Sequence, residues 1–188
     1  MNEKEVLNIF HKTGGILNGH FLLSSGLHSD IYIQCALPLM YPEYVSFFSK
    51  IIYEKTLKLS PSIIISPAIG GLIIGFGVAS EFRLPFVFTE REYGVMKLRR
   101  GFKINKGDRV LIVEDVVTTG KSTLEVKKII EREGGEVVGG ASIIKRGKPD
   151  FSFPYYYILE LELNAYLPDQ CPFCKNNIPI VKPGSNKL

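Results

Sequence analysis

Short apolar runs alternate with amphipathic segments along most of the chain. Runs rich in β-branched residues at 62–65, 85–89, 109–113 and 137–144 are typical of buried strands. Apolar residues at helical spacing predict helices over 3–12, 43–58 and 122–133, and the glycine-rich stretch 68–82 predicts a helix packed closely on a strand. Because strands and helices alternate, the pattern predicts an α/β fold with a central parallel sheet flanked by helices.

The two ends of the chain have a different character. Residues 14–40 contain strand-like pieces around a Ser-Gly turn, and an apolar run at 155–163 precedes a tail punctuated by Pro168, Pro172, Pro179 and Pro183. We therefore expect one domain over residues 1–188, with a core at about 43–150 and a small hood formed by about 14–40 and 155–188.

The composition is that of an ordinary globular protein. Of the 188 residues, 45% are hydrophobic and 22% are charged, which argues against disorder. No apolar run reaches the roughly 18 residues of a membrane span, and the charged first 15 residues do not resemble a signal peptide. The three cysteines, an odd number without a secretion signal, favour a reducing compartment. We expect a cytoplasmic protein with no membrane partner.

The segment RVLIVEDVVTTGKSTLEVKKIIEREGG carries the clearest chemistry. A strand runs into two acids, Glu114 and Asp115, and a Thr/Gly/Ser loop then leads into a helix. Loops at the carboxyl ends of parallel strands bind ligands, and a helix start offers free N–H groups to a phosphate. Carboxylates accept hydrogen bonds from sugar hydroxyls and attract a divalent cation. Together these features predict a site for a phosphorylated sugar.

This segment has two other interpretations. The Thr and Ser residues would serve only as helix caps if the junction were purely structural. A P-loop nucleotide site is disfavoured, because Asp115 occupies the position where that motif needs a glycine before Gly120-Lys121-Ser122.

The segment VLIVEDVVTTGKS resembles the phosphoribosyl diphosphate motif of the type I phosphoribosyltransferases. The resemblance implies that family's fold, a hooded parallel sheet. It also implies that Glu114 and Asp115 hold the ribose hydroxyls, that residues 118–122 enclose the 5-phosphate, and that Mg²⁺ binds the diphosphate near the two acids, with no direct side-chain ligand assigned. The implied phosphoribosyl diphosphate site comprises Glu114, Asp115, Val116, Val117, Thr118, Thr119, Gly120, Lys121, Ser122, Arg91, Ala68, Ile69, Gly70 and Gly71.

Further segments resemble the orotate phosphoribosyltransferases in particular, and together they span almost the whole chain. GHFLLSSGLHSDIYIQC is similar to the segment that covers the base, which implies that Tyr32 and Ile33 contact orotate. SPAIGG is similar to the loop that receives the diphosphate on main-chain N–H groups. ASIIKRG places Arg146 where the family binds the orotate carboxylate, and Thr118 falls on an orotate-contacting threonine.

Basic residues crowd the stretch 91–109, namely Arg91, Lys97, Arg99, Arg100, Lys103, Lys106 and Arg109. By itself this pattern fits a solvated loop. The resemblance places FTEREYGVMKLRRGF at the mobile catalytic loop, which in the family reaches into the partner subunit and implies a homodimer. Lys97, Arg91 and Asp115 are the expected catalytic residues, with Lys97 as the proton donor, because arginine stays protonated at neutral pH.

The expected reaction joins orotate and 5-phosphoribosyl 1-diphosphate, with no nucleic-acid partner. A phosphoribosyltransferase for another base, and a regulator that senses the diphosphate and binds DNA, are the alternatives. The latter is disfavoured because only one short helix precedes the hairpin.

Cys171 and Cys174 form a single Cys-x-x-Cys pair, for which structural thiols, a metal site and a redox pair stay open. Zinc would need further ligands from Cys35 or a histidine, brought near by folding. His11 is expected at the surface, and His20 and His28 flank the base-covering hairpin.

Overall fold

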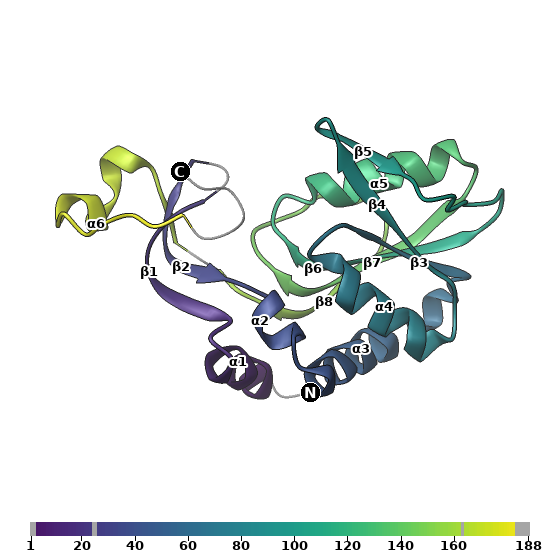
Figure 1. Ribbon diagram of the computed structural model, residues 1–188, viewed down its shortest axis with the longest axis horizontal. Helices are drawn as coiled ribbons and strands as arrows, with labels where there is room; N and C mark the ends of the chain where they lie inside the picture. Colours follow the sequence, from purple (N-terminus) through teal and green to yellow (C-terminus); the bar gives the residue numbers. More distant parts are fainter. Residues whose placement is uncertain (1–2, 24–25, 163, 183–188) are drawn as a thin grey trace.

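The computed structural model describes residues 3–23, 26–162 and 164–182, and its larger part is built on a six-stranded sheet (Figure 1). The strand order is β5-β4-β3-β6-β7-β8. Five strands run parallel: β3 (Ile63–Pro67), β4 (Phe86–Glu92), β6 (Arg109–Val117), β7 (Glu136–Lys145) and β8 (Tyr155–Glu160). The edge strand β5 (Val95–Leu98) pairs antiparallel with β4.

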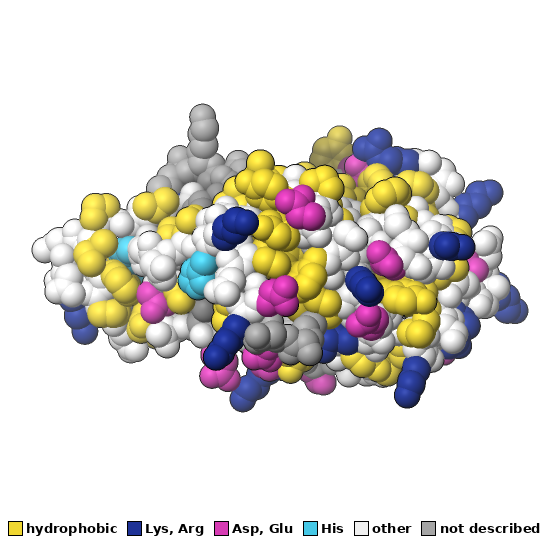
Figure 2. Space-filling view, turned by 90° about the horizontal axis from the view of Figure 1, so that it is seen from below, with side chains coloured by type: hydrophobic (Ala, Val, Ile, Leu, Met, Phe, Trp, Pro, Cys, Tyr) yellow, Lys and Arg dark blue, Asp and Glu magenta, His cyan; other side chains and the backbone are white. Residues whose placement is uncertain are grey.

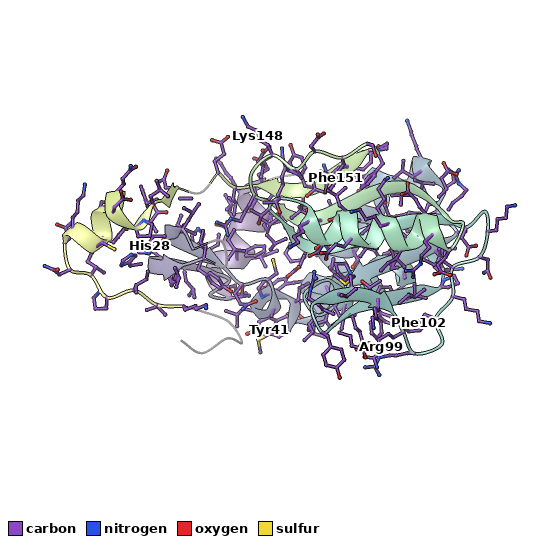
Figure 3. The ribbon with its side chains drawn as sticks, turned by 90° about the horizontal axis from the view of Figure 1, so that it is seen from above. His28, Tyr41, Arg99, Phe102, Lys148 and Phe151 are labelled. Atoms are coloured by element: carbon purple, nitrogen blue, oxygen red, sulfur yellow. The ribbon has the colours of Figure 1, made fainter. Side chains whose placement is uncertain are left out.

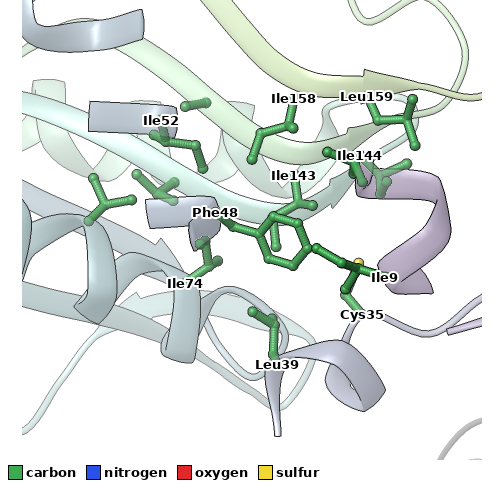
Figure 4. Close-up of a cluster of buried hydrophobic side chains, with 14 of the residues drawn as sticks. Ile9, Cys35, Leu39, Phe48, Ile52, Ile74, Ile143, Ile144, Ile158 and Leu159 are labelled. Atoms are coloured by element: carbon green, nitrogen blue, oxygen red, sulfur yellow. The ribbon is translucent and has the colours of Figure 1, made fainter. Parts of the chain in front are cut away.

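Helices cover both faces of this sheet. Helices α3 (Pro42–Thr56) and α4 (Gly71–Phe82) lie on one face, and α5 (Lys121–Arg132) lies on the other (Figure 1). A 3₁₀ turn, η1 (Leu57–Leu59), follows α3. Phe48 and Ile52 of α3 and Ile74 of α4 lie in the larger apolar cluster together with Ile143 and Ile144 of β7 (Figure 4). The strands read as continuous apolar runs because both of their faces are buried.

The hood is assembled from the two ends of the chain. Strands β1 (Ile16–Leu22) and β2 (His28–Ile33) form an antiparallel hairpin, and the short β9 (Ala165–Tyr166) pairs with β2. The last described turns are η2 (Pro168–Gln170) and α6 (Pro172–Lys175). Helix α2 (Ala36–Leu39) leads from the hood to the core, and α1 (Glu3–Lys12), which precedes β1, buries one face in the same apolar cluster as Phe48.

Most of the elements expected from the sequence are confirmed, within a few residues at each end. The boundary of the hood was wrong, because β8 pairs with β7 and belongs to the core sheet. The hood contribution from the second half of the chain therefore begins near β9, after residue 163. Pro183 and part of the Ser-Gly turn lie outside the described residues. None of the helices in the described part of the chain is long and apolar enough to cross a bilayer.

Candidate active site

The phosphate loop connects β6, which lies between β3 and β7, to α5. Its residues line a cavity of about 150 Å³, and the lining residues are Glu114, Val116, Val117, Thr118, Thr119, Gly120, Lys121 and Ser122. The Lys121 N–H donates to Thr119 Oγ1 at 3.4 Å, so the threonine hydroxyl helps to set the turn. The start of α5 directs N–H groups and the positive end of the helix dipole into this cavity, which suits a phosphate dianion.

Gly120 closes the phosphate loop in a conformation that favours glycine. Its φ is +75°, and a β-carbon at this position would lie 2.5 Å from the Phe151 ring. Phe151 lies on the segment between β7 and β8 (Figure 3), where it stacks on Phe153 with 4.9 Å between ring centroids. The aromatic pair therefore forms a fixed wall behind the loop, and only glycine fits between that wall and the cavity.

Of the two acids at the end of β6, Glu114 is buried and Asp115 is half-buried. Glu114 accepts a hydrogen bond from the Thr123 hydroxyl, one turn inside α5. Burial raises the pKa of Glu114 to about 7, an effect that the Thr123 hydrogen bond opposes and the Asp115 charge reinforces. Burial also raises the pKa of Asp115, against hydrogen bonds from the main chain of Val116 and Asp115. Neither carboxylate has a basic partner among these causes, so both are suited to receive hydroxyl donors or a cation from a ligand.

The SPAIGG loop lies directly against these acids. A β-carbon on Gly70 would come within 2.5 Å of Asp115 Oδ2. The Ala68 N–H donates to the Thr89 carbonyl at 2.8 Å, so of the four residues that the sequence predicted as diphosphate donors in this loop, Ala68 has its N–H already engaged. The first turn of α4 begins here, so its N–H groups have no partner within the helix. The SPAIGG loop and the phosphate loop, both of which offer main-chain N–H groups, therefore lie on either side of Asp115.

Arg146 emerges at the same edge of the sheet. Its N–H donates to the Val117 carbonyl at 2.7 Å, which places its backbone beside the phosphate loop and the adjacent Thr118. Burial lowers the pKa of its guanidinium, and the nearby Tyr32 acts in the opposite direction. Tyr32 belongs to β2, so the structure brings the hood and the core together at this arginine. The Ile33 side chain points into the apolar core.

The basic stretch folds as a hairpin of β4 and β5, although the sequence predicted a loop. Arg91 pairs with Glu125 of α5 at 2.5 Å, and Lys97 pairs with Glu92 at 2.6 Å. Arg99 and Arg100 pair with Glu92 and Glu90. Arg109 is different, because it opens β6 at the opposite end of the strand and binds the Leu59 and Ser60 carbonyls.

Sequence reasoning missed three residues that shape this site. Thr123 binds Glu114, Phe151 supports Gly120, and Glu125 pairs with Arg91. Thr123 and Glu125 lie within the first two turns of α5, a position from which a spacing argument would have found them. Phe151 gave no such signal, because its role depends on how the β7–β8 segment folds back.

The phosphoribosyl transferase domain model matches residues 43–160, which ends with β8. The orotate phosphoribosyltransferase of Caldanaerobacter subterraneus subsp. tengcongensis is 50% identical over 190 residues, covering 100% of both chains. The chain belongs to the orotate phosphoribosyltransferase family.

Other members of the family agree with this assignment. The orotate phosphoribosyltransferase of Carboxydothermus hydrogenoformans is 44% identical over 187 residues, which cover 97% of this chain and 98% of that protein. The crystal structure of orotate phosphoribosyltransferase from Aeropyrum pernix has the same fold, with a TM-score of 0.74 and 24% identity over 83% of this chain and 93% of that one. The type I phosphoribosyltransferase fold expected from the sequence is therefore confirmed.

Proposed function

We propose that this protein transfers the ribose 5-phosphate of 5-phosphoribosyl 1-diphosphate to orotate, giving orotidine 5′-phosphate and diphosphate in pyrimidine nucleotide synthesis. The observation that carries the proposal is the cavity between β6 and α5. It joins a phosphate-sized cradle of main-chain donors to the buried Glu114, beside which lies the half-buried Asp115. Full-length similarity to orotate phosphoribosyltransferases supports the choice of orotate.

The phosphate loop holds one end of the substrate and thereby positions its sugar. In this proposal, residues 118–122 donate to the 5-phosphate, while Glu114 and Asp115 accept hydrogen bonds from the ribose hydroxyls. Displacement at the anomeric carbon develops positive charge on the sugar, and the neighbouring carboxylates stabilise that charge. Fixed donors at one end and acceptors at the other align the anomeric carbon without a covalent intermediate.

A Mg²⁺ ion fits the chemistry of these donors. The Glu114 carboxylate is buried and the Asp115 carboxylate is half-buried, and loss of solvent raises the pKa of each. A hard divalent cation prefers oxygen ligands and would favour the ionised forms of both. We propose that the pair holds a hydrated Mg²⁺ that arrives with the diphosphate, where it would neutralise the leaving group.

Arg146 and Tyr32 are the proposed contacts for the base. The guanidinium lies in a half-buried environment that lowers its pKa, so a carboxylate bound there would gain a strong paired hydrogen bond. Thr118 and the backbone of Ile33 complete the proposed orotate site. Orotate differs from uracil by its carboxylate, so an arginine at this position would distinguish the two bases.

The β4–β5 hairpin is the proposed source of catalytic cations. Arg91 and Lys97 are held in exposed ion pairs in this structure, and such pairs contribute little free energy. They can therefore exchange Glu125 and Glu92 for the diphosphate at low cost. Lys97 would act as the proton donor, because arginine does not give up its proton at neutral pH.

A homodimer and a cytoplasmic location are parts of the same proposal. Met40 and Phe76, which are 64% and 63% exposed, border an apolar groove along α3 and α4. Figure 2, viewed from below Figure 1, shows patches of hydrophobic side chains on this face. A second copy of the chain is the proposed occupant, and light scattering in solution tests it.

The three free cysteines fit a reducing compartment.

A panel of bases tests the reaction. The protein is incubated with Mg²⁺, 5-phosphoribosyl 1-diphosphate and orotate, uracil, adenine or hypoxanthine in turn, and each base is followed by absorbance. We expect consumption of orotate alone, and none when the diphosphate is omitted. Consumption of a purine would select a different phosphoribosyltransferase, and binding of the diphosphate without turnover would select a regulatory protein.

A further inference from the structure

Four side chains from the two ends of the chain converge within the hood. His20 lies on β1, His28 on β2, and Cys171 and Cys174 flank the start of α6. Their ligand atoms all lie within 4.8 Å of one another. His20, His28 and Cys171 are buried, and Cys174 closes the group at the surface. In Figure 3, His28 lies in the hood beside α6, far from the Phe151 wall of the active site.

The distances within this group match those of a tetrahedral metal site. With Zn–N of about 2.05 Å and Zn–S of about 2.3 Å, a tetrahedron separates two nitrogens by about 3.3 Å and a nitrogen from a sulfur by about 3.6 Å. His20 Nε2 lies 2.9 Å from His28 Nδ1. Cys171 Sγ and Cys174 Sγ lie 3.4 Å and 3.7 Å from His20 Nε2, and Cys174 Sγ lies 3.3 Å from His28 Nδ1. Shifts of a few tenths of an ångström in these ligand atoms would produce the distances of an ideal tetrahedral site.

The surroundings orient His20 as a ligand. Its Nδ1 lies 2.8 Å from the Ile178 carbonyl, which can only accept, so Nδ1 carries the proton. In a neutral ring the proton on Nδ1 leaves the lone pair on Nε2, the atom that faces the two sulfurs. Phe173 stacks on the His20 ring with 5.5 Å between centroids. A hydrogen bond to the distal ring nitrogen is the usual support of a metal-bound histidine.

The tail needs such an attachment, because it has almost no apolar core of its own. Among the described residues from 164 to 182, Cys171 alone is buried. The main chain adds two hydrogen bonds between β1 and the tail, from Leu22 N–H to the Val181 carbonyl at 2.9 Å and from Val181 N–H to the His20 carbonyl at 2.8 Å. Small segments without a core are commonly held by a metal or a disulfide.

We propose that His20, His28, Cys171 and Cys174 bind one structural Zn²⁺ that fastens the C-terminal tail to the β1–β2 hairpin. Two thiolates and two neutral imidazoles balance the charge of the ion, which allows the site to be buried. A Cys-x-x-Cys pair at the start of a short helix supplies two ligands from one turn. A disulfide between the two cysteines would not explain why the His20 and His28 rings face the sulfur atoms.

Metal analysis of the purified chain tests the proposal. Protein prepared without chelators is expected to contain about one zinc per chain by mass spectrometry of the elements. Cys174→Ser and His28→Asn should each lose most of it. His11→Asn and Cys35→Ala are the matched controls, because His11 is exposed on α1 and Cys35 is buried away from the cluster, and both should keep the metal.

Cobalt provides a readout that does not depend on how the variants fold. The wild-type chain, stripped of metal and reduced, should take up one equivalent of Co²⁺ with the intense visible bands of a tetrahedral ion and a thiolate charge-transfer band. Octahedral-type weak bands, or no uptake of either Co²⁺ or Zn²⁺, would overturn the proposal. A native mass about 2 Da below the reduced chain would also overturn it, because it would show a disulfide between the cysteines.

A consequence for catalysis rests on the proposed function. The same hairpin carries Tyr32, so removing zinc should raise KM for orotate several-fold while KM for the diphosphate stays unchanged. The metal analysis is independent of activity. Zinc bound to a chain that does not use orotate would contradict the proposed function alone. Protein purified without chelators that uses orotate but holds no zinc would contradict the metal site alone.

Discussion

Gly70 lies so close to the Asp115 carboxylate that a β-carbon at this position would come within 2.5 Å of Oδ2. Gly70 directly precedes α4, whereas Asp115 lies near the end of β6. Their contact fixes the spacing between the proposed diphosphate donors and the proposed ribose acceptors. A side chain at position 70 therefore cannot be added without moving one of these groups.

Gly70→Ala should weaken use of 5-phosphoribosyl 1-diphosphate while the fold persists. The new methyl group would push Asp115 away from the sugar, and misplacement by about 1 Å can cost about 100-fold in rate. Steady-state kinetics would show this as a lower kcat/KM for the diphosphate. Gly107→Ala is the control, because nothing lies within 4 Å of the β-carbon that it adds. Equal kinetics in the two variants would contradict the assigned role.

Gly120→Ala should disable the phosphate loop. The residue has φ +75°, and its added β-carbon would lie 2.5 Å from the Phe151 ring. Gly107→Ala is a matched control, since Gly107 has φ +87° with nothing within 4 Å of the added atom. Both variants should lose about 1 kcal/mol of stability from the backbone strain. Only Gly120→Ala should also lose affinity for ribose 5-phosphate by calorimetry, and equal affinities would count against the cradle.

Two inactive variants should restore activity when they are mixed, if the hairpin serves the site of a partner. Asp115→Asn removes the proposed ribose acceptor, and Lys97→Ala removes the proposed proton donor, so each should lose about 10- to 100-fold in kcat/KM. Random exchange of subunits would create one intact site in half of the dimers, or about a quarter of the wild-type rate. If the mixture is no more active than the separate variants, Lys97 does not serve the site of the partner subunit. Lys97 would then act in the same subunit as Asp115, or would lie outside the active site.

Stability should fall as the pH rises through the titration of Glu114. Its pKa is about 7 in the folded protein against an ordinary value of 4.5, so the folded state holds the proton more tightly than the unfolded chain. The free energy of unfolding should therefore decline from about pH 5 to about pH 8, by up to roughly 3 kcal/mol from this group. Urea unfolding of Glu114→Gln should show a flatter profile over the same range. Parallel profiles for the two proteins would mean that Glu114 is ionised throughout.

Arg146→Lys should impair orotate use although it keeps the positive charge. Lysine cannot form the paired hydrogen bonds of a guanidinium with a carboxylate, so KM for orotate should rise roughly tenfold. KM for the diphosphate should change little. Lys148→Ala, an exposed cation two residues away, should leave both constants unchanged. An equal rise in both constants for Arg146→Lys would point to a structural role at the end of β7.

The sequence predicted the core of this protein well because local pattern and tertiary environment agree there. The four residues after Arg109, Val110–Val113, are apolar in sequence and lie in a central strand of the sheet. The Thr/Gly/Ser loop after Asp115 is directly followed by an amphipathic segment, which forms α5. The apolar run at 155–163 could not be assigned to the core or the hood, because its pattern is the same in either. Pairing with β7, a long-range contact, decides that question.

The site was predictable where its residues are neighbours in sequence and not where folding brings them together. Glu114 through Ser122 form one continuous motif. The β4–β5 hairpin was expected as a loop, because its many charged residues are typical of a solvated loop. In the structure these charges form ion pairs within the hairpin, such as Lys97 with Glu92. His20 and Cys171 are 151 positions apart, so no spacing rule joins them.

The hood sheet takes β1 and β2 from the first 33 residues and β9 from residues 165–166. During synthesis the hairpin therefore emerges from the ribosome long before its third strand exists. The core sheet can close as soon as β8 has appeared, but the hood sheet must wait for β9, which follows β8 in the chain. Domains generally fold in the order of synthesis, and here the hood begins before the core sheet and is completed after it.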